Sequence, residues 1–356
     1  MHRSTRRLPF TNAGTNCAGF AKRGLIAQKR ESNRSALAPT ARQAAPSPLT
    51  ATETLADNAP IFLNLDAAIA QVSSQIDAQF DALLVVPDDA RRRLYEAMRH
   101  AAIGGGKRLR PLLVVATANL FHADRDVALR VATALEAIHV YSLIHDDLPC
   151  MDDDDMRRGK PTVHKAFDEA TAVLAGDSLH ALAFEILASS ATHADPFIRS
   201  ELIATLALAS GPDGMAGGQM MDLEAEQAQF DLPTVTRLQA LKTGALIAAS
   251  VEMGAILGHV PPEGRVRLRG YARDIGLAFQ IADDILDVEG DEALAGKKLY
   301  KDAQAGKGTF VSLMGLDRAK EQAAMLVTQA TEHLSIYGSE ADLLRAIAHY
   351  VLERDH

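Results

Sequence analysis

The stretch DVALRVATALEAIHVYSLIHDDLPCMDD, residues 126–153, decides the fold class. Its apolar side chains recur at helical spacing, which places four residues on one stripe: Val131, Leu135, Ile138 and Ser142. Pro149 does not fit inside a helix, so we expect the helix to end near Leu148. A short turn would then carry Asp152 back toward Asp146.

Helical spacing continues through most of the chain from about residue 60. It recurs around Phe184 and Leu187 and in five later segments: 200–210, 234–258, 264–289, 310–334 and 341–353. Gly-Pro and Pro-Pro pairs at 211–212 and 261–262 separate some of these segments. No stretch shows convincing period-two alternation, and no repeat of fixed period is present. The sequence predicts an all-α bundle of about ten helices in one domain.

Charge is unevenly distributed along the 356 residues, whose net value is −9. Residues 1–52 contain nine of the 37 lysines and arginines but one of the 46 acidic residues. The remaining chain is therefore strongly acidic, which argues against nucleic acid as its partner. Two cysteines, Cys17 and Cys150, form no disulfide framework and indicate a reducing compartment. The apolar stretch Ala245–Val260 is interrupted by Glu252 and is short for a bilayer, so we expect no transmembrane segment.

Residues 1–58 have the composition of a disordered basic extension, and residues 59–356 would form the folded domain. The extension is rich in arginine and poor in acids, as organelle transit peptides are. The alternative is an upstream start that adds dispensable residues. We therefore expect a cytoplasmic protein, with organelle targeting as the alternative.

Two aspartate clusters lie about 130 residues apart. The first contains Asp146, Asp147 and Asp152 and is followed by Arg157 and Arg158. The second contains Asp283, Asp284 and Asp287, of which the first and last are one helical turn apart. Carboxylates beside apolar helix faces need a cation, and Mg²⁺ prefers such oxygen ligands. The run of acids after Asp152 could alone be a solvated loop, but the pair of clusters favours metal-bridged diphosphate binding.

Basic groups surround these clusters in the sequence. Gly104–Gly106 precede Lys107 and Arg110 at the start of an expected helix, where anions are favoured. His139 lies two helical turns before Asp146, and we interpret it as a hydrogen-bond donor to an anionic substrate. Other candidates, each compatible with an ordinary surface residue if taken singly, are Asp222, Lys242, Thr243, Lys297 and Lys307.

The ordered motifs GGGKRLRP, HDDLPCMDDDDMRRGKPT, GGQMMD, KTG and FQIADDILD resemble trans-isoprenyl diphosphate synthases, most closely the bacterial farnesyl type. The resemblance covers residues 62–355. It implies an all-α bundle around a deep central cavity, a homodimer, and Mg²⁺, with three ions when substrate is bound. It also implies head-to-tail condensation of isopentenyl diphosphate with dimethylallyl or geranyl diphosphate to give farnesyl diphosphate.

The resemblance implies specific residue roles. Metal ions would be held by Asp146, Asp147, Asp152, Asp283 and Asp287. The allylic diphosphate would contact Arg157, Lys242, Gln280 and Lys297, while Thr243 and Gln280 would steady a carbocation. Isopentenyl diphosphate would bind Lys107, Arg110, His139 and Arg158. The catalytic set is then Asp146, Asp152, Arg157, Lys242, Thr243, Gln280, Asp283 and Lys297.

Product length is expected to depend on Tyr141, about 7.5 Å along the helix from Asp146, with the small Ser142 beside it. An aromatic residue here resembles farnesyl diphosphate synthases, whereas DDLPCMD also resembles plant geranylgeranyl diphosphate synthases. In the loop after the second aspartate cluster, Tyr300 stands where the family usually has glycine, and Val311 stands where proline commonly follows the aromatic Phe310. The resemblance therefore does not predict how this loop closes. Further alternatives are geranylgeranyl diphosphate synthase activity, a class I terpene cyclase, a non-catalytic regulatory subunit, or ordinary core packing for Tyr141.

Overall fold

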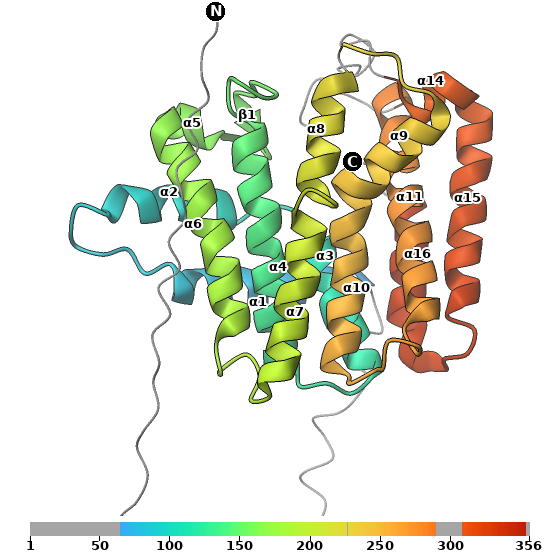
Figure 1. Ribbon diagram of the computed structural model, residues 1–356, viewed down its shortest axis with the longest axis horizontal. Coiled ribbons are helices and arrows are strands. Elements are labelled where there is room, and N and C mark those ends of the chain that lie inside the picture. The colour runs from blue at the N-terminus through green and yellow to red at the C-terminus, as the bar shows by residue number, and fades with distance from the viewer. Residues whose placement is uncertain (1–64, 226, 290–307, 354–356) are drawn as a thin grey trace, which may run out of the picture. The chain divides into compact units, whose positions relative to one another are not determined.

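The computed structural model describes residues 65–225, 227–289 and 308–353, which form a helical bundle with one small hairpin (Figure 1). The α-helices are α1 Leu65–Leu83, α2 Arg92–Ala102, α3 Leu109–Leu120, α4 Arg125–Asp146, α5 Val163–Ala166, α6 Glu169–Ala188, α7 Pro196–Ser210, α8 Met215–Ala225, α9 Leu232–Gln239, α10 Ala245–Leu257, α11 Val266–Glu289, α14 Phe310–Met314, α15 Leu316–His333 and α16 Asp342–Glu353. The all-α prediction is confirmed. Among the described residues the structure also contains short helices such as α5, which have too few residues to show a helical period in the sequence.

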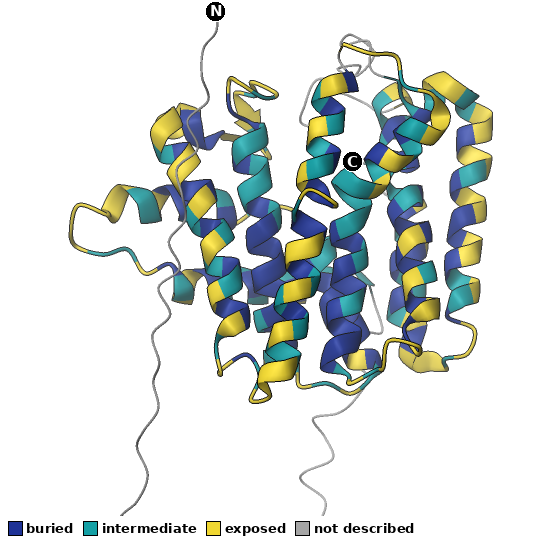
Figure 2. Ribbon diagram, viewed as in Figure 1, coloured by how far each residue is buried: buried dark blue, intermediate teal, exposed yellow. Residues whose placement is uncertain are grey.

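Helices α3, α4 and α10 form the centre of the bundle. Helix α3 packs on both α4 and α10, α4 packs on α6, and α11 packs on α15. Dark blue, buried residues concentrate on the central helices, while the peripheral helices carry yellow outer faces (Figure 2). Val131, Leu135 and Ile138, three members of the predicted stripe, are fully buried on α4. The apolar period therefore positions the helix that ends at the first aspartate cluster.

Helix ends follow local side-chain chemistry. Asp124, before α4, accepts a hydrogen bond from the Val127 amide at 3.0 Å. Asp168 caps α6 in the same way through the Thr171 amide at 2.7 Å. Gly315 has a φ of +87° and separates α14 from α15, which the sequence had predicted as one segment.

A two-stranded hairpin, β1 Met156–Arg157 and β2 Lys160–Pro161, follows the first aspartate cluster. The residues of its turn, Arg158 and Gly159, have positive φ values of 52° and 73°. Such a turn matches the twist of paired strands. The sequence did not predict these strands, because two residues are too few to show alternation.

Three helical segments are long and apolar enough, by length and composition, to cross a membrane: Arg125–Asp146, Glu169–Ala188 and Leu232–Leu257. The last of them is longer than the interrupted stretch considered from the sequence, because α9 and α10 are continuous through a π-helical turn, η1 Ala240–Gly244. The bundle buries 67%, 39% and 56% of their apolar windows, respectively. The expectation that no segment spans a membrane therefore stays a prediction.

Candidate active site

The first aspartate cluster lies where α4 ends. The Asp152 amide donates a hydrogen bond of 2.8 Å to the Asp146 carbonyl, and the Met151 amide donates one of 2.8 Å to the Leu148 carbonyl. The predicted turn that returns Asp152 to Asp146 is thereby confirmed. The helix ends slightly earlier than expected, at Asp146, with Asp147 as its C-cap.

Asp146 occupies an environment that opposes its negative charge. Burial raises the pKa of its carboxyl to about 6, and the neighbouring Asp152 and Asp147 carboxylates act in the same direction. The ammonium of Lys242 and the guanidinium of Arg157 lower the pKa but do not cancel the effect of burial. A carboxylate in this position gains most from an additional cation.

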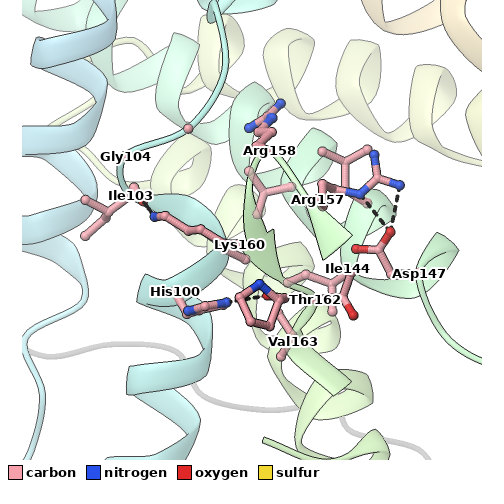
Figure 3. Close-up of a pocket in the computed structure, with 15 residues that line it drawn as sticks. His100, Ile103, Gly104, Ile144, Asp147, Arg157, Arg158, Lys160, Thr162 and Val163 are labelled. Atoms are coloured by element: carbon pink, nitrogen blue, oxygen red, sulfur yellow. Dashed lines mark hydrogen bonds and ion pairs between the residues drawn. The ribbon is translucent and has the colours of Figure 1, made fainter. Parts of the chain in front are cut away.

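Arg157 and Asp147 form an ion pair beside this cluster. The Arg157 Nε donates to Asp147 Oδ1 at 2.7 Å, and Nη2 lies 2.6 Å from the same oxygen (Figure 3). The Asp147 side chain is buried, with 4% exposed, and Arg157 also lies 3.8 Å from Asp154. The structure thus brings together a predicted metal ligand and a predicted diphosphate ligand, while their assigned roles stay predictions.

The second cluster lies on α11, as predicted, with Asp283 and Asp287 half-buried. Asp284 between them is buried, accepts a hydrogen bond from Gln280 Nε2 at 3.3 Å, and accepts another from the Phe310 amide at 2.7 Å. Asp284 therefore joins α11 to the start of α14.

The π-helical turn η1 connects the two clusters. Lys242 Nζ lies 2.8 Å from Asp222 on α8, and its charge acts on Asp146 of α4. Its neighbour Thr243 donates a hydrogen bond of 3.1 Å to Gln280 on α11. A π-helical turn inside a helix often marks a functional site because it redirects side chains. Here it points successive residues toward two different partners.

Close helix packing places this turn. A Cβ on Gly218 of α8 would lie 2.1 Å from the Lys242 backbone nitrogen, so only glycine fits. The GGQMMD motif thus supplies both the small residue that admits η1 and Asp222, which holds the Lys242 ammonium. The sequence singled out Gly218 and Asp222 without predicting either contact.

Three of the four predicted isopentenyl diphosphate ligands gather beside the glycine-rich loop. Arg110 Nη1 lies 3.5 Å from His139 Nε2. Burial, followed by the charges of Arg110 and Arg158, holds the pKa of His139 well below its usual range. A Cβ on Gly106 would lie 2.6 Å from Arg158 Cζ, so the guanidinium covers this loop. The fourth residue, Lys107, lies with its ammonium 5.2 Å from the ring centre of Tyr350 on α16.

A buried ion-pair network that the sequence did not predict holds the same loop. Arg108 lies 2.6 Å from Glu136 on α4 and 2.7 Å from Asp77 on α1, and the Arg108 side chain is fully buried. Its φ of 48° is unusual for a residue with a side chain. Glu136, an acidic residue among the apolar residues of α4, was the feature of the sequence that could have indicated this network, because a buried carboxylate needs a partner.

A small cavity of about 50 Å³ lies between α2, α4 and the hairpin (Figure 3). Asp147, Arg157, Arg158 and Lys160 line its polar side. Lys160 also donates a hydrogen bond of 3.1 Å to the Ile103 carbonyl. This volume admits water but not an isoprenoid chain.

Residues 91–346 match the model of the polyprenyl synthetase family. The chain belongs to this family. As a polyprenyl synthetase it is a prenyltransferase, so the enzyme class predicted from the motifs is confirmed. This membership disfavours the two alternatives of a terpene cyclase and a non-catalytic subunit.

This polyprenyl synthetase is 46% identical to the farnesyl diphosphate synthase of Escherichia coli, over 73% of this chain and 89% of that protein. It is also 41% identical to a chloroplastic geranylgeranyl pyrophosphate synthase of Capsicum annuum, over 82% of this chain and 79% of that protein. A crystal structure of an FPP/GFPP synthase from Zymomonas mobilis aligns with a TM-score of 0.75 at 61% identity and covers 81% of this chain and 99% of that one.

Tyr141, the predicted floor, is half-buried among aromatic rings of the polyprenyl synthetase. Its ring meets His180 edge-on at 5.0 Å and His145 at 5.7 Å, and His180 in turn meets Phe184 at 5.2 Å. Ser142 donates a hydrogen bond of 2.9 Å to the His139 carbonyl. Edge-to-face contacts fix the tyrosine ring, while its role in chain length stays a prediction.

Some predicted residues lie outside the described ranges, namely Lys297, Tyr300 and Lys307. Val311 is described and is half-buried in the first turn of α14. Residues 1–58 also lie outside these ranges, so the expected boundary of the extension stays a prediction.

Proposed function

We propose that this polyprenyl synthetase makes farnesyl diphosphate from isopentenyl diphosphate and the allylic substrates dimethylallyl and geranyl diphosphate. The observation that carries the proposal is the charge arrangement at the end of α4. There the charges of Lys242, Arg157 and Asp152 act on the half-buried Asp146. The 46% identity to a farnesyl diphosphate synthase supports this substrate and product class.

The donor set fits magnesium. Asp146 at the end of α4 and Asp152 in the following turn, with Asp283 and Asp287 on α11, offer carboxylate oxygens, the ligand type that Mg²⁺ prefers. The raised pKa of Asp146 indicates a carboxylate that lacks sufficient positive charge from the protein alone. We propose three ions with substrate bound. The chemistry that Mg²⁺ supplies when bound is neutralisation of charge on the departing diphosphate.

The cationic side chains would act in the same direction. Lys242 and Arg157 stabilise the diphosphate as the allylic C–O bond ionises, since each can exchange its carboxylate partner for a phosphate oxygen. The Thr243 hydroxyl donates a hydrogen bond to the Gln280 side-chain carbonyl oxygen, and the dipoles of both groups would be oriented toward the carbocation. The double bond of isopentenyl diphosphate would then form the new C–C bond to the allylic carbocation, and the resulting cation would lose a proton to the released diphosphate.

The second substrate would occupy the basic group beside the glycine-rich loop. A depressed pKa keeps the His139 imidazole neutral near pH 7, so it can donate one hydrogen bond without adding charge. Arg110 and Arg158 supply the positive charge and the paired N–H groups that suit phosphate oxygens.

We propose that the main product is C15 and that Tyr141 forms the floor of the chain-binding cavity, which limits the product to this length. Geranylgeranyl diphosphate is the second candidate, because a relative of that name is 41% identical. Purified protein with Mg²⁺ and labelled isopentenyl diphosphate should be given dimethylallyl, geranyl and farnesyl diphosphate separately. A dominant C15 product with no extension of farnesyl diphosphate is expected. Extension to C20 or beyond would reject the farnesyl assignment, and no condensation at all would reject the activity.

A homodimer is also part of the proposal. Helix α6 is apolar yet exposes Val173 and Leu174, by 41% and 56%, on the side away from the core. A second copy of the chain would cover such a face. Light scattering should give the mass of a dimer, and Leu174→Arg should convert it to a monomer. We further propose that the protein acts in the cytoplasm, which localisation of the full chain and of a chain beginning at residue 59 would test.

A further inference from the structure

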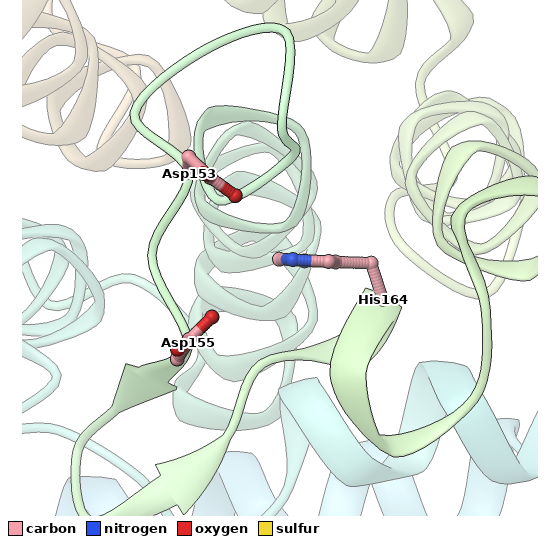
Figure 4. A group of neighbouring side chains, drawn as sticks. All are labelled: Asp153, Asp155 and His164. Carbon is pink, nitrogen blue, oxygen red and sulfur yellow. The ribbon is translucent and has the colours of Figure 1, made fainter.

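One group of metal-ligating atoms lies outside the proposed magnesium site. Among the described residues, a carboxylate oxygen from each of Asp153 and Asp155 and a ring nitrogen of His164 lie within 4.8 Å of one another. Figure 4 shows the His164 imidazole directed into the space between the two carboxylates. The three side chains come from the turn after Asp152 and from α5, which the hairpin connects.

His164 is buried, with 8% exposed, and its Nε2 atom has no hydrogen-bond partner. Buried nitrogen atoms are seldom left without a partner, because removal from water costs free energy that nothing returns. An acidic cluster alone is usually a solvated surface. Here a buried imidazole points into the acidic cluster of Asp153 and Asp155, which a solvated surface does not explain.

Hydrogen bonds fix the tautomer of this imidazole. The Thr162 hydroxyl has one proton, which it donates to the Asp154 carbonyl at 2.8 Å. The same hydroxyl oxygen lies 3.2 Å from His164 Nδ1, and while the hydroxyl donates to a carbonyl this contact is a hydrogen bond if Nδ1 carries the proton. Nδ1 then carries the hydrogen, and Nε2 presents a lone pair. A metal-bound histidine has this arrangement, in which the second ring nitrogen donates to a fixed acceptor.

We propose that Asp153, Asp155 and His164 bind a divalent transition-metal ion such as Zn²⁺ or Co²⁺, at a site separate from the magnesium clusters. Imidazole nitrogen with carboxylate oxygen suits these ions, whereas Mg²⁺ favours oxygen ligands alone. Asp155 Oδ1 forms an ion pair with Lys165 at 2.8 Å, and in the proposed site the other oxygen of this carboxylate would bind the ion.

Small movements would complete the coordination. Ligand atoms about 2.0–2.1 Å from a tetrahedral zinc lie roughly 3.4 Å apart, so separations of up to 4.8 Å must shorten by up to about 1.4 Å. Asp153 can supply this movement, since it is exposed in a turn. His164 would stay in place, because burial and the Thr162 hydrogen bond hold it.

Such an ion would join the turn that follows Asp152 to the segment after the hairpin. Arg157 lies in the same region, 3.8 Å from Asp154. The Thr162 hydroxyl already joins the two segments by its hydrogen bond to the Asp154 carbonyl. The proposed ion therefore adds a second tie close to the catalytic carboxylates without contributing to the reaction itself.

The test is Co²⁺ binding to the untagged full-length protein, in excess Mg²⁺ and without diphosphate. Visible absorption bands of Co²⁺ are weak in the six-coordinate aqua ion and become intense in four- or five-coordinate sites, so they report entry into a low-coordinate site, and the His164→Gln variant then tests whether the imidazole is a ligand. We expect one equivalent of Co²⁺ to produce such bands and Zn²⁺ to displace it. His164→Gln should abolish the bands, and Asp153→Asn should weaken binding at least tenfold.

Two variants separate this site from other ligands. His349→Gln removes an exposed histidine on α16, and Asp283→Asn removes a proposed magnesium ligand. Both should bind Co²⁺ as the wild type does, even though the second should lose prenyltransferase activity. Wild-type protein without the bands, or bands that survive in His164→Gln, would overturn the proposal. If His164→Gln fails to fold, unchanged affinity in the exposed Asp153→Asn variant would overturn it equally.

Discussion

Replacement of Asp146 by asparagine should stabilise the metal-free protein while it abolishes activity. Burial raises the pKa of this carboxyl from 3.8 to about 6, so the ionised form is disfavoured in the folded state. Asparagine has nearly the same shape and carries no charge. A carboxylate that catalysis requires is therefore a burden on the fold when no cation accompanies it.

The pKa shift sets the size of this effect. A rise of about two units corresponds to about 3 kcal/mol in the free energy of unfolding, taken as an upper limit. For a domain of this size, that amounts to a melting temperature higher by on the order of 5–10 °C in the variant.

The direction of the pKa shift determines how the stability difference between the wild type and Asp146→Asn changes with pH. Because the folded-state pKa is above the unfolded one, the native carboxyl holds its proton more tightly than the unfolded chain does. The wild type should match Asp146→Asn below about pH 4, lose stability relative to it between pH 4 and 6, and remain less stable above pH 6. Thermal melts in EDTA at pH 4, 5, 6 and 7 measure this difference directly.

A matched control is Asp152→Asn, since Asp152 belongs to the same cluster but is exposed. It should lower activity strongly and change stability little. Mg²⁺ with a diphosphate should reverse the order of the Asp146 pair and stabilise the wild type more than the variant. An Asp146→Asn protein that melts below the wild type at pH 7 in EDTA would refute the reasoning, as would an advantage independent of pH.

Three other substitutions test the remaining contacts. Tyr141→Ala should lengthen the products, because it removes the aromatic ring below the first cluster; chromatography of the dephosphorylated alcohols measures this, and unchanged length places the floor elsewhere. Gly218→Ala should lower kcat at least tenfold, because its Cβ would lie 2.1 Å from the Lys242 nitrogen and displace η1; unaltered kcat would contradict this packing. Arg108→Met should cost about 3–5 kcal/mol of stability in urea melts, since it leaves buried Glu136 unpaired, and a loss below 1 kcal/mol would contradict that account.

The sequence itself predicted the long helices and the turn that follows α4. Apolar residues at helical spacing are a local property, so the period alone predicts that Asp283 and Asp287 share one face of a helix. Pro149 likewise predicts a turn, because no packing can restore the amide hydrogen that proline lacks. The two-residue strands and the short helices were not predictable, since they contain too few residues to show any period.

Tertiary structure alone decided which charged groups meet. Nothing in the spacing of the sequence pairs Arg157 with Asp147, or Lys242 with an aspartate of another helix, because both arginine and lysine reach several partners on long side chains. Those choices depend on how closely the helices approach, and the approach depends on single small residues such as Gly218. The orientation of His164 is decided in the same way, by a threonine hydroxyl whose proton is already committed to a backbone carbonyl. Sequence therefore determined which chemical groups the site contains, and packing determined which of them act on one another.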